Sequence, residues 1–147
     1  MPTRVKATLL NKNIAFKVNI KDFPEFVMDE PETFHGNDLG PSAGEFLLVS
    51  IAGCQGVSFQ FCLQKFKIEV EEMTVTVESK MSHVWHEEYQ REILNIVHMD
   101  VVIDVKLKNP EDEENLLECF DVFQKFCVVT TSVRHGIPID VKLNHRA

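Results

Sequence analysis

The sequence lacks the features that mark several classes of protein. Its 15 Lys and Arg residues are dispersed and outnumbered by 23 Asp and Glu, which gives a formal net charge of -8. Binding to nucleic acid requires clustered basic residues, so we expect no nucleic-acid partner. No apolar run approaches the roughly 20 residues that cross a bilayer, so we also expect no membrane association. Residues 1–6 lack the apolar core of a signal peptide, which predicts a cytoplasmic protein.

The four cysteines also lack the spacing of a metal-binding or redox motif. Seven residues separate Cys54 from Cys62, and seven separate Cys119 from Cys127. This spacing matches neither a CxxC redox motif nor a zinc knuckle, so we expect no metal and no bound cofactor. Because no export signal is found, we expect reduced thiols rather than disulfides.

No internal repeat, linker or low-complexity tract divides the chain. Its 147 residues match the usual length of one domain. A content of 44% hydrophobic and 26% charged residues is typical of a globular protein. The sequence therefore predicts a single domain over residues 1–147, and the order of its elements predicts an α+β fold.

The N-terminal part reads as short strands followed by a loop. Alternation over residues 5–18, with a turn at residues 12–13, predicts a β-hairpin. Residues 26–28 predict a further short strand, and the Pro, Gly, Asn and acidic residues of segment 29–40 predict a polar loop.

A long central helix is predicted after this loop. Ser42 and Glu45 fit a capping box, in which each side chain binds the backbone N–H of the other residue. Residues 46–66 are apolar on every side of a helix, so this helix must be covered all round. A small domain provides too little cover for such a helix, and we therefore expect a homodimer.

The rest of the chain predicts two more strands, a second helix and a final strand. Residues 68–77 and 93–107 alternate as antiparallel partners, with residues 83–88 as the connecting turn. Asn109-Pro110 and the acidic residues that follow predict a helix start. Cys127 falls on the apolar stripe of that helix.

The end of this second helix is predicted from its β-branched residues. Residues 128–131 sit poorly in a helix, so we expect a break just after Cys127. Residues 134–136 then end the helical region with cationic residues and a glycine. Residues 137–143 alternate in the manner of a last strand.

From the residues alone, the cysteines allow two interpretations. Cys54 and Cys127 lie far apart in sequence, each on the inward face of a predicted helix. They could meet in the core as a peroxide-reacting thiol and its resolving partner. They could equally be small buried hydrophobic residues, because free Cys is among the most buried residue types.

The residues around these cysteines favour the first interpretation. Residues 40–54 (GPSAGEFLLVSIAGC) and residues 125–127 (KFC) resemble the OsmC/Ohr superfamily, in its OsmC-like branch. The resemblance implies antiparallel sheets wrapped around a long buried central helix. It also implies an intertwined homodimer with an active site at the subunit interface and an organic or hydrogen peroxide as substrate.

The resemblance gives the two motif cysteines roles in peroxide reduction. Cys54 matches the peroxidatic position, where a thiolate breaks the O–O bond and becomes a sulfenic acid. Cys127 matches the resolving position, which forms a disulfide that an external dithiol, typically a lipoylated protein, reduces. No motif covers Cys62 or Cys119, and we assign them no role.

The family's peroxidases also use an Arg from the N-terminal strands and a Glu at the helix start. The strand region offers Lys12, Lys17 and Lys21, and a Lys lacks the fixed fork of a guanidinium. Glu45 matches the Glu, but on a straight helix it lies about 13 Å from Cys54 and about 180° round. It would serve the partner's site, or only the capping box. The alternative function is a catalytically weak OsmC-like protein that responds to redox state or binds a small ligand.

Overall fold

The computed structural model describes residues 2–146 of an α+β chain. The chain has two compact units, residues 2–49 and residues 50–146, and helix α1 (Ala43–Lys65) continues from the first into the second. Antiparallel sheets and a long helix are present, as the sequence predicts. The organisation as a single domain over residues 1–147 stays a prediction.

The first unit is built on a three-stranded antiparallel sheet. Its strands β1 (Val5–Leu9), β2 (Phe16–Ile20) and β3 (Phe26–Met28) are arranged in the order β1-β2-β3. The turn between β1 and β2 places Asn11 and Asn13 at positive φ, a conformation that asparagine tolerates better than most residues. The predicted hairpin and short strand are confirmed.

A buried carboxylate organises the loop that follows β3. The loop contains one turn of 3-10 helix, η1 (Glu32–Phe34). Asp29 accepts hydrogen bonds from the backbone N–H groups of Glu30 at 2.8 Å, Asn37 at 3.1 Å and Leu39 at 3.2 Å. Burial raises the pKa of Asp29, but these three donors outweigh it and hold the pKa below its usual value. The loop is therefore ordered around one charge.

Helix α1 begins with the predicted capping box. The Ser42 backbone N–H donates to Glu45 Oε1 at 3.0 Å, and the Glu45 backbone N–H donates to Ser42 Oγ at 3.2 Å. These bonds satisfy two N–H groups that have no partner within the helix. The start of the central helix is thus specified by neighbouring residues.

The same helix is long and apolar enough to cross a membrane, judged by length and composition alone. This corrects the expectation that no apolar segment is long enough to cross a bilayer. The residues between the apolar ones in this helix are mostly small and uncharged, so its mean hydropathy stays high. A core helix of a soluble protein passes the same test. Ile51, Phe59 and Leu63 of α1 are indeed buried against the rest of the second unit. The cytoplasmic location stays a prediction.

A long antiparallel hairpin forms the sheet of the second unit. Strands β4 (Val70–His86) and β5 (Arg91–Leu107) pair from Val70↔Leu107 to His86↔Arg91. The prediction of a turn at residues 83–88 is therefore wrong. The strand pairing continues to His86, and residues 87–90 connect the two strands. Polar side chains at the exposed end of a ladder do not prevent its backbone groups from pairing.

Two helices follow the hairpin. A 3-10 turn, η2 (Pro110–Asp112), leads into α2 (Glu113–Phe123), close to the predicted start. Helix α3 (Val128–His135) then contains the β-branched residues that we expected to break the helix. That expectation is wrong, because β-branched residues cost only some tenths of a kcal/mol each in a helix. The break lies at residues 124–127 instead, and Gly136 with φ 76° ends α3 as predicted.

The predicted last strand over residues 137–143 is wrong. Within the described part of the chain, no strand is assigned after α3. Ile139 and Val141 are 79% and 92% exposed. The sequence alternates as a strand does, but no strand of this chain pairs with it, and a strand needs a partner for its backbone groups.

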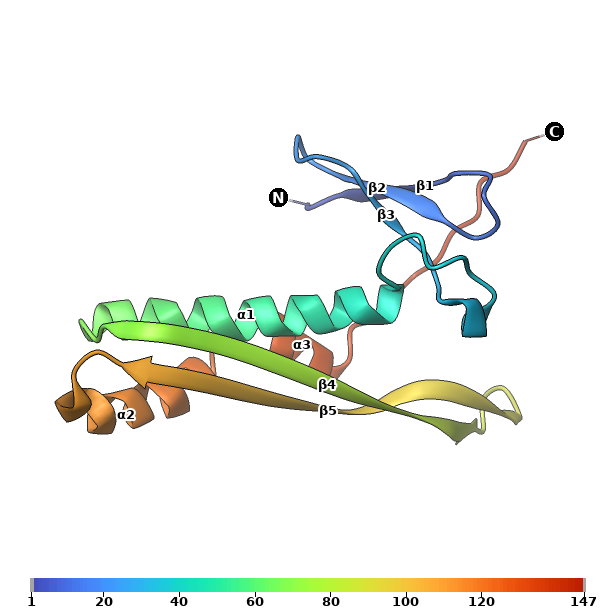
Figure 1. Cartoon of the computed structure of the whole chain (residues 1–147). Helices are drawn as coiled ribbons and strands as arrows, with labels where there is room; N and C mark the ends of the chain where they lie inside the picture. The colour runs from blue at the N-terminus through green and yellow to red at the C-terminus, as the bar shows by residue number, and fades with distance from the viewer. Residues whose placement is uncertain (1, 147) are drawn as a thin grey trace. The chain divides into compact units, whose positions relative to one another are not determined.

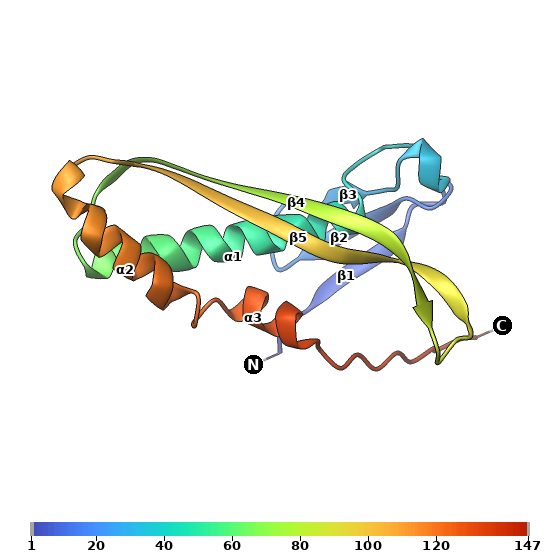
Figure 2. The ribbon, with the colours of Figure 1, turned by 90° about the horizontal axis from the view of Figure 1, so that it is seen from below.

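The core of the second unit lies between the hairpin and its helices. Figure 2 shows α1, α2 and α3 on one side of β4 and β5, and Figure 1 shows that α1 and α2 run in opposite directions. Residues from both of these helices form one buried cluster: Phe59, Cys62, Leu63, Ile68, Cys119 and Phe123. Apolar residues of β4 and β5 pack against this cluster, so the helices cover the inner face of the hairpin.

Candidate active site

The structure brings together the two cysteines that the sequence singles out. Cys54 lies on α1, and Cys127 lies just before α3. Their Sγ atoms are 2.7 Å apart although 73 positions separate the residues, and both are free thiols. We call these two residues the site pair. The distance exceeds the roughly 2.05 Å of a disulfide bond, and the pair is held as two hydrogen-bonded thiols in which either sulfur can be the donor.

The two sulfurs of the site pair differ in their access to solvent. Cys127 is fully buried, whereas Cys54 is partly exposed. Cys127 has an extended backbone, with φ -76° and ψ 95°, in the break between α2 and α3. The prediction that Cys127 points into the core is confirmed, but its place on the stripe of a continuous helix is wrong.

The first turn of α3 faces Cys54. The backbone N–H of Val129 donates to Cys54 Sγ at 3.4 Å. This N–H belongs to a helix N-terminus, where unpaired N–H groups and the helix dipole favour negative charge. The Val129 N–H therefore holds the sulfur of Cys54 against the start of α3.

Side chains on two helices surround Cys127. Gln55 Nε2 donates to Cys127 Sγ at 3.5 Å and to Thr130 Oγ1 at 2.9 Å. Thr130 Oγ1 lies 3.2 Å from Cys127 Sγ, and Ser58 also hydrogen-bonds with this sulfur. Burial raises the pKa of the Cys127 thiol, but hydrogen bonds with Cys54, Thr130 and Ser58 outweigh it, so the pKa lies below its ordinary value. The site pair is thus arranged to lose one proton readily.

Sequence reasoning missed the residues that tune this pair. Gln55 is only 4% exposed, although it directly follows Cys54 in an apolar helix. A buried amide must find hydrogen-bond partners, so a lone Gln in such a run was the available signal. Thr130 gives no comparable signal, because nothing in the sequence around it shows that its side chain is buried.

The other predicted site residues have partners outside the site pair. The capping box holds the carboxylate of Glu45, and the backbone N–H of Ser42 lowers the pKa of Glu45. Lys17 lies in the first unit and pairs with Glu25 at 4.0 Å. The donors that the structure does place on the two sulfurs are an amide, hydroxyls and a backbone N–H, all of them neutral. A catalytic role for Glu45 across a dimer stays a prediction.

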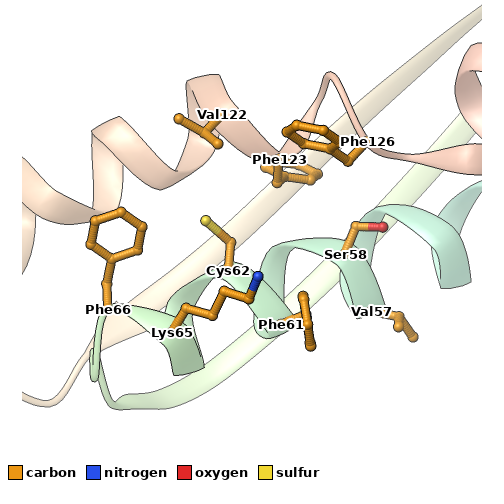
Figure 3. Close-up of a pocket in the computed structure, with 9 residues that line it drawn as sticks. All are labelled: Val57, Ser58, Phe61, Cys62, Lys65, Phe66, Val122, Phe123 and Phe126. Carbon is orange, nitrogen blue, oxygen red and sulfur yellow. The ribbon is translucent and has the colours of Figure 1, made fainter.

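An apolar cavity of about 510 Å³ is lined by residues that neighbour the site pair, although neither Cys54 nor Cys127 is itself part of its wall. Ser58, which bonds Cys127, and Phe126, which precedes it, are both part of its wall. Figure 3 shows the nine residues that line it, which come from α1 and the residue after it, from the end of α2, and from the break before α3: Val57, Ser58, Phe61, Cys62, Lys65, Phe66, Val122, Phe123 and Phe126. Lys65 is the one charged residue among these nine, and its Nζ lies 4.7 Å from the ring centre of Phe61. The cavity suits an apolar molecule.

Metal ligands are not grouped in the part of the chain that the structure describes. Among residues 2–146, no three His, Cys, Asp or Glu side chains lie together as a metal site.

Comparison with known proteins gives both a family and a fold. A family model described as OsmC-like protein matches residues 35–142. No curated protein matches the chain significantly. Among solved structures, an OsmC-like protein from Mycoplasma pneumoniae is similar with a TM-score of 0.72 and 16% identity, over 91% of this chain and 88% of the other.

Two further structures carry functional descriptions. An organic hydroperoxide resistance protein OsmC from Legionella pneumophila matches with a TM-score of 0.65 and 16% identity, over 91% of this chain and 90% of the other. An organic hydroperoxide resistance protein from Elizabethkingia anophelis matches with a TM-score of 0.64 and 17% identity, over 91% and 89%. At these identities the likeness shows the fold.

Proposed function

The chain belongs to the OsmC-like protein family, within the OsmC/Ohr superfamily, and we propose that it reduces hydroperoxides with the thiols of Cys54 and Cys127. The observation that carries this proposal is the contact of two free thiols at 2.7 Å between segments 73 positions apart. One sulfur is partly exposed, and the other is buried among hydrogen-bond donors. This is the arrangement that a reacting thiol and a resolving thiol require.

Cys54 takes the first step because it is the sulfur that solvent reaches. Its thiolate attacks the distal oxygen of the hydroperoxide, so an S–O bond forms and the O–O bond breaks. The alkoxide that leaves takes a proton and becomes an alcohol, or water when the substrate is hydrogen peroxide. Cys54 is left as a sulfenic acid, and the N–H of Val129 continues to face its sulfur.

Cys127 takes the second step without a large movement. Its thiolate attacks the sulfur of the sulfenic acid, an S–S bond forms, and hydroxide leaves to become water. The hydrogen bonds with Cys54, Thr130 and Ser58 that lower the pKa of Cys127 keep this thiolate available. An external dithiol, for example on a lipoylated protein, then reduces the disulfide and becomes a disulfide itself.

The cavity beside the site pair favours organic hydroperoxides over hydrogen peroxide. Its wall is mostly apolar, and burying an apolar group contributes about 25 cal/mol per Å². The Legionella and Elizabethkingia proteins described as organic hydroperoxide resistance proteins support the same preference. We therefore propose an organic hydroperoxide as the preferred substrate.

A homodimer completes the proposal. Val57 and Phe61 of α1 are 73% and 59% exposed, which is unusual for large apolar residues on a central helix. A second subunit would contact these side chains and form part of the mouth of the cavity that they line. Light scattering after size-exclusion chromatography should give twice the chain mass of 16.9 kDa. Phe61→Asp should shift the protein toward monomer, whereas Phe61→Leu, which keeps the apolar surface, should not.

Peroxide consumption tests the proposed function directly. Cumene hydroperoxide and dihydrolipoamide, a small dithiol, are mixed with the wild-type chain, and the loss of peroxide is followed. Turnover should continue until the dithiol is exhausted. Cys54→Ser should remove this rapid turnover. Cys127→Ser, treated with peroxide in the absence of dithiol, should consume one equivalent of peroxide per chain at Cys54 and stop at the sulfenic acid.

The neutral surroundings of the site pair favour one alternative function. Without a cation to stabilise the developing alkoxide, the thiols could oxidise reversibly and turn over slowly, in a redox-responsive or ligand-binding protein. Such a protein would form the Cys54–Cys127 disulfide with peroxide but would turn over no faster than peroxide and dithiol react without protein. Continued rapid turnover would exclude this alternative.

A further inference from the structure

The second unit contains another pair of cysteines in contact. Cys62 lies on α1 and Cys119 on α2, and both belong to the buried cluster beneath the hairpin. The two thiols share a hydrogen bond. We call these residues the core pair. Their contact is a consequence of the antiparallel course of the two segments, since Cys62 follows Cys54 by eight positions and Cys119 precedes Cys127 by eight.

The core pair is too far from the site pair to act in the same reaction. Eight residues of helix correspond to about 12 Å along the axis of α1. A sulfenic acid or disulfide must be in contact with the thiol that attacks it. Cys62 and Cys119 therefore neither resolve Cys54 nor exchange with its disulfide, and any chemistry at the core pair must start there.

A route from solvent reaches one sulfur of the core pair. Cys62 is part of the wall of the 510 Å³ cavity, and Figure 3 shows its sulfur pointing from α1 toward α2, near Val122 and Phe123. Cys119 has no exposed surface and is not among the lining residues. A small apolar molecule in the cavity would therefore meet Cys62 first.

The environment also divides the roles within the core pair. Burial raises the pKa of the Cys119 thiol to about 12, and the hydrogen bond and charge of Cys62 act in the same direction. Cys119 therefore keeps its proton and donates it toward the sulfur of Cys62.

We propose that Cys62 and Cys119 form a second oxidisable dithiol, which an apolar organic hydroperoxide entering the cavity converts to a disulfide between α1 and α2. Cys62 attacks the distal peroxide oxygen, the O–O bond breaks, and the alcohol leaves. Cys119 then attacks the sulfur of the Cys62 sulfenic acid, and its proton leaves with the hydroxide as water. Two thiols and one hydroperoxide thus give one disulfide, one alcohol and one water.

This cross-link differs in its consequence from that of the site pair. It joins α1 to α2 inside the buried cluster, where the sulfurs are shielded from a large reductant. A small dithiol such as dithiothreitol can still enter the cavity and reverse it. After exposure to hydroperoxide, the disulfide of the core pair would therefore persist for longer than that of the site pair.

The variant Cys54→Ser/Cys127→Ser tests the proposal separately from the proposed function, because only the core pair remains. The folded variant is treated with cumene hydroperoxide and mapped by mass spectrometry without reduction. The peptides that contain Cys62 and Cys119 should become cross-linked, with the loss of two hydrogens. Cumene hydroperoxide should act about tenfold faster than hydrogen peroxide at equal concentration, because its ring enters an apolar cavity.

Single substitutions in this background provide the controls. Adding Cys119→Ser should leave Cys62 as a sulfenic acid that dimedone traps, and adding Cys62→Ser should leave Cys119 unmodified. If the double variant does not fold, excess cumene hydroperoxide on the wild-type chain should give both disulfides in sequence. Thiols of the core pair that stay reduced, or a Cys62 that oxidises without a cross-link to Cys119, would overturn the proposal.

Discussion

The site pair and the core pair place the same chemical groups in opposite environments. At the site pair, hydrogen-bond donors surround the buried sulfur and hold the pKa of Cys127 below its ordinary value. At the core pair, burial dominates and raises the pKa of Cys119 to about 12. Both pairs join α1 to the segment of α2 and α3. The reactivity of each thiol therefore depends on the polar groups around it, not on its place in the fold.

The difference follows from a few side chains. Gln55, Ser58 and Thr130 are the polar residues that face Cys127, and no buried polar side chain takes the equivalent place among the described members of the core cluster. Hydrogen bonds to an ionised group contribute about 1.5–3 kcal/mol each. Two or three such bonds are enough to outweigh the cost of burying one thiolate.

The largest expected effect is the loss of the reacting sulfur. Cys54→Ser should lower the rate of peroxide consumption by at least about a thousandfold, because the nucleophile is gone. Cys119→Ser should lower it by less than about threefold, since Cys119 is not part of the cavity wall and belongs to the core pair. Equal losses in the two variants would contradict the distinction between the pairs. Steady-state peroxide consumption with dihydrolipoamide measures both.

The rates of alkylation by iodoacetamide at neutral pH should differ by about a hundredfold between Cys127 and Cys119. Iodoacetamide reacts with thiolates, and the lowered pKa of Cys127 means that this thiol ionises at a lower pH than an ordinary cysteine. Labelling of Cys127 should therefore level off below the usual thiol pKa of about 8.5. Because its pKa is about 12, Cys119 should stay unlabelled up to pH 10. Peptide mass spectrometry of the native protein follows both, and early labelling of Cys119 would contradict the comparison.

Removing one donor should make the site pair more like the core pair. Gln55→Leu takes away the N–H groups that face Cys127 and Thr130. The pKa of Cys127 should rise, because its thiolate loses a hydrogen-bond donor at 3.5 Å. Peroxide consumption at neutral pH should fall about tenfold and recover at higher pH. A loss that is the same at every pH would indicate damage to the fold instead.

The smallest expected effect concerns Ser58, which lies between the two pairs along α1. Ser58→Ala removes one hydroxyl from Cys127 but leaves Gln55 and Thr130 in place. The rate of peroxide consumption should fall by about threefold, since a partly exposed hydrogen bond contributes less than a buried one. The rate of the core-pair cross-link should not change. A larger loss than that of Gln55→Leu would reverse the ranking of the donors.

Features that depend on neighbouring residues were predictable from the sequence. The start of α1 follows from Ser42 and Glu45, and strand β3 was predicted with its observed bounds. The pairing of Cys54 with Cys127 was suggested by a family resemblance, not by spacing. Local signals thus located the helix that carries the reacting sulfur.

Features that depend on distant partners were not predictable in this way. Residues 137–143 alternate like a strand, but whether a partner strand exists is not a local property. Residues 128–131 form part of α3 although their propensities oppose it. The contact between Cys62 and Cys119 has no sequence signal beyond the equal spacing of the two cysteine pairs. It becomes visible only when α1 and α2 pack in opposite directions.

The most direct test of the central claim is the order in which the two disulfides form. One equivalent of cumene hydroperoxide is added to the reduced wild-type chain, and the cross-linked peptides are identified by mass spectrometry without reduction. We expect the Cys54–Cys127 disulfide in most chains, with Cys62 and Cys119 still reduced. A Cys62–Cys119 disulfide that forms first, or four thiols that stay unmodified, would contradict the claim that the site pair is the reactive one.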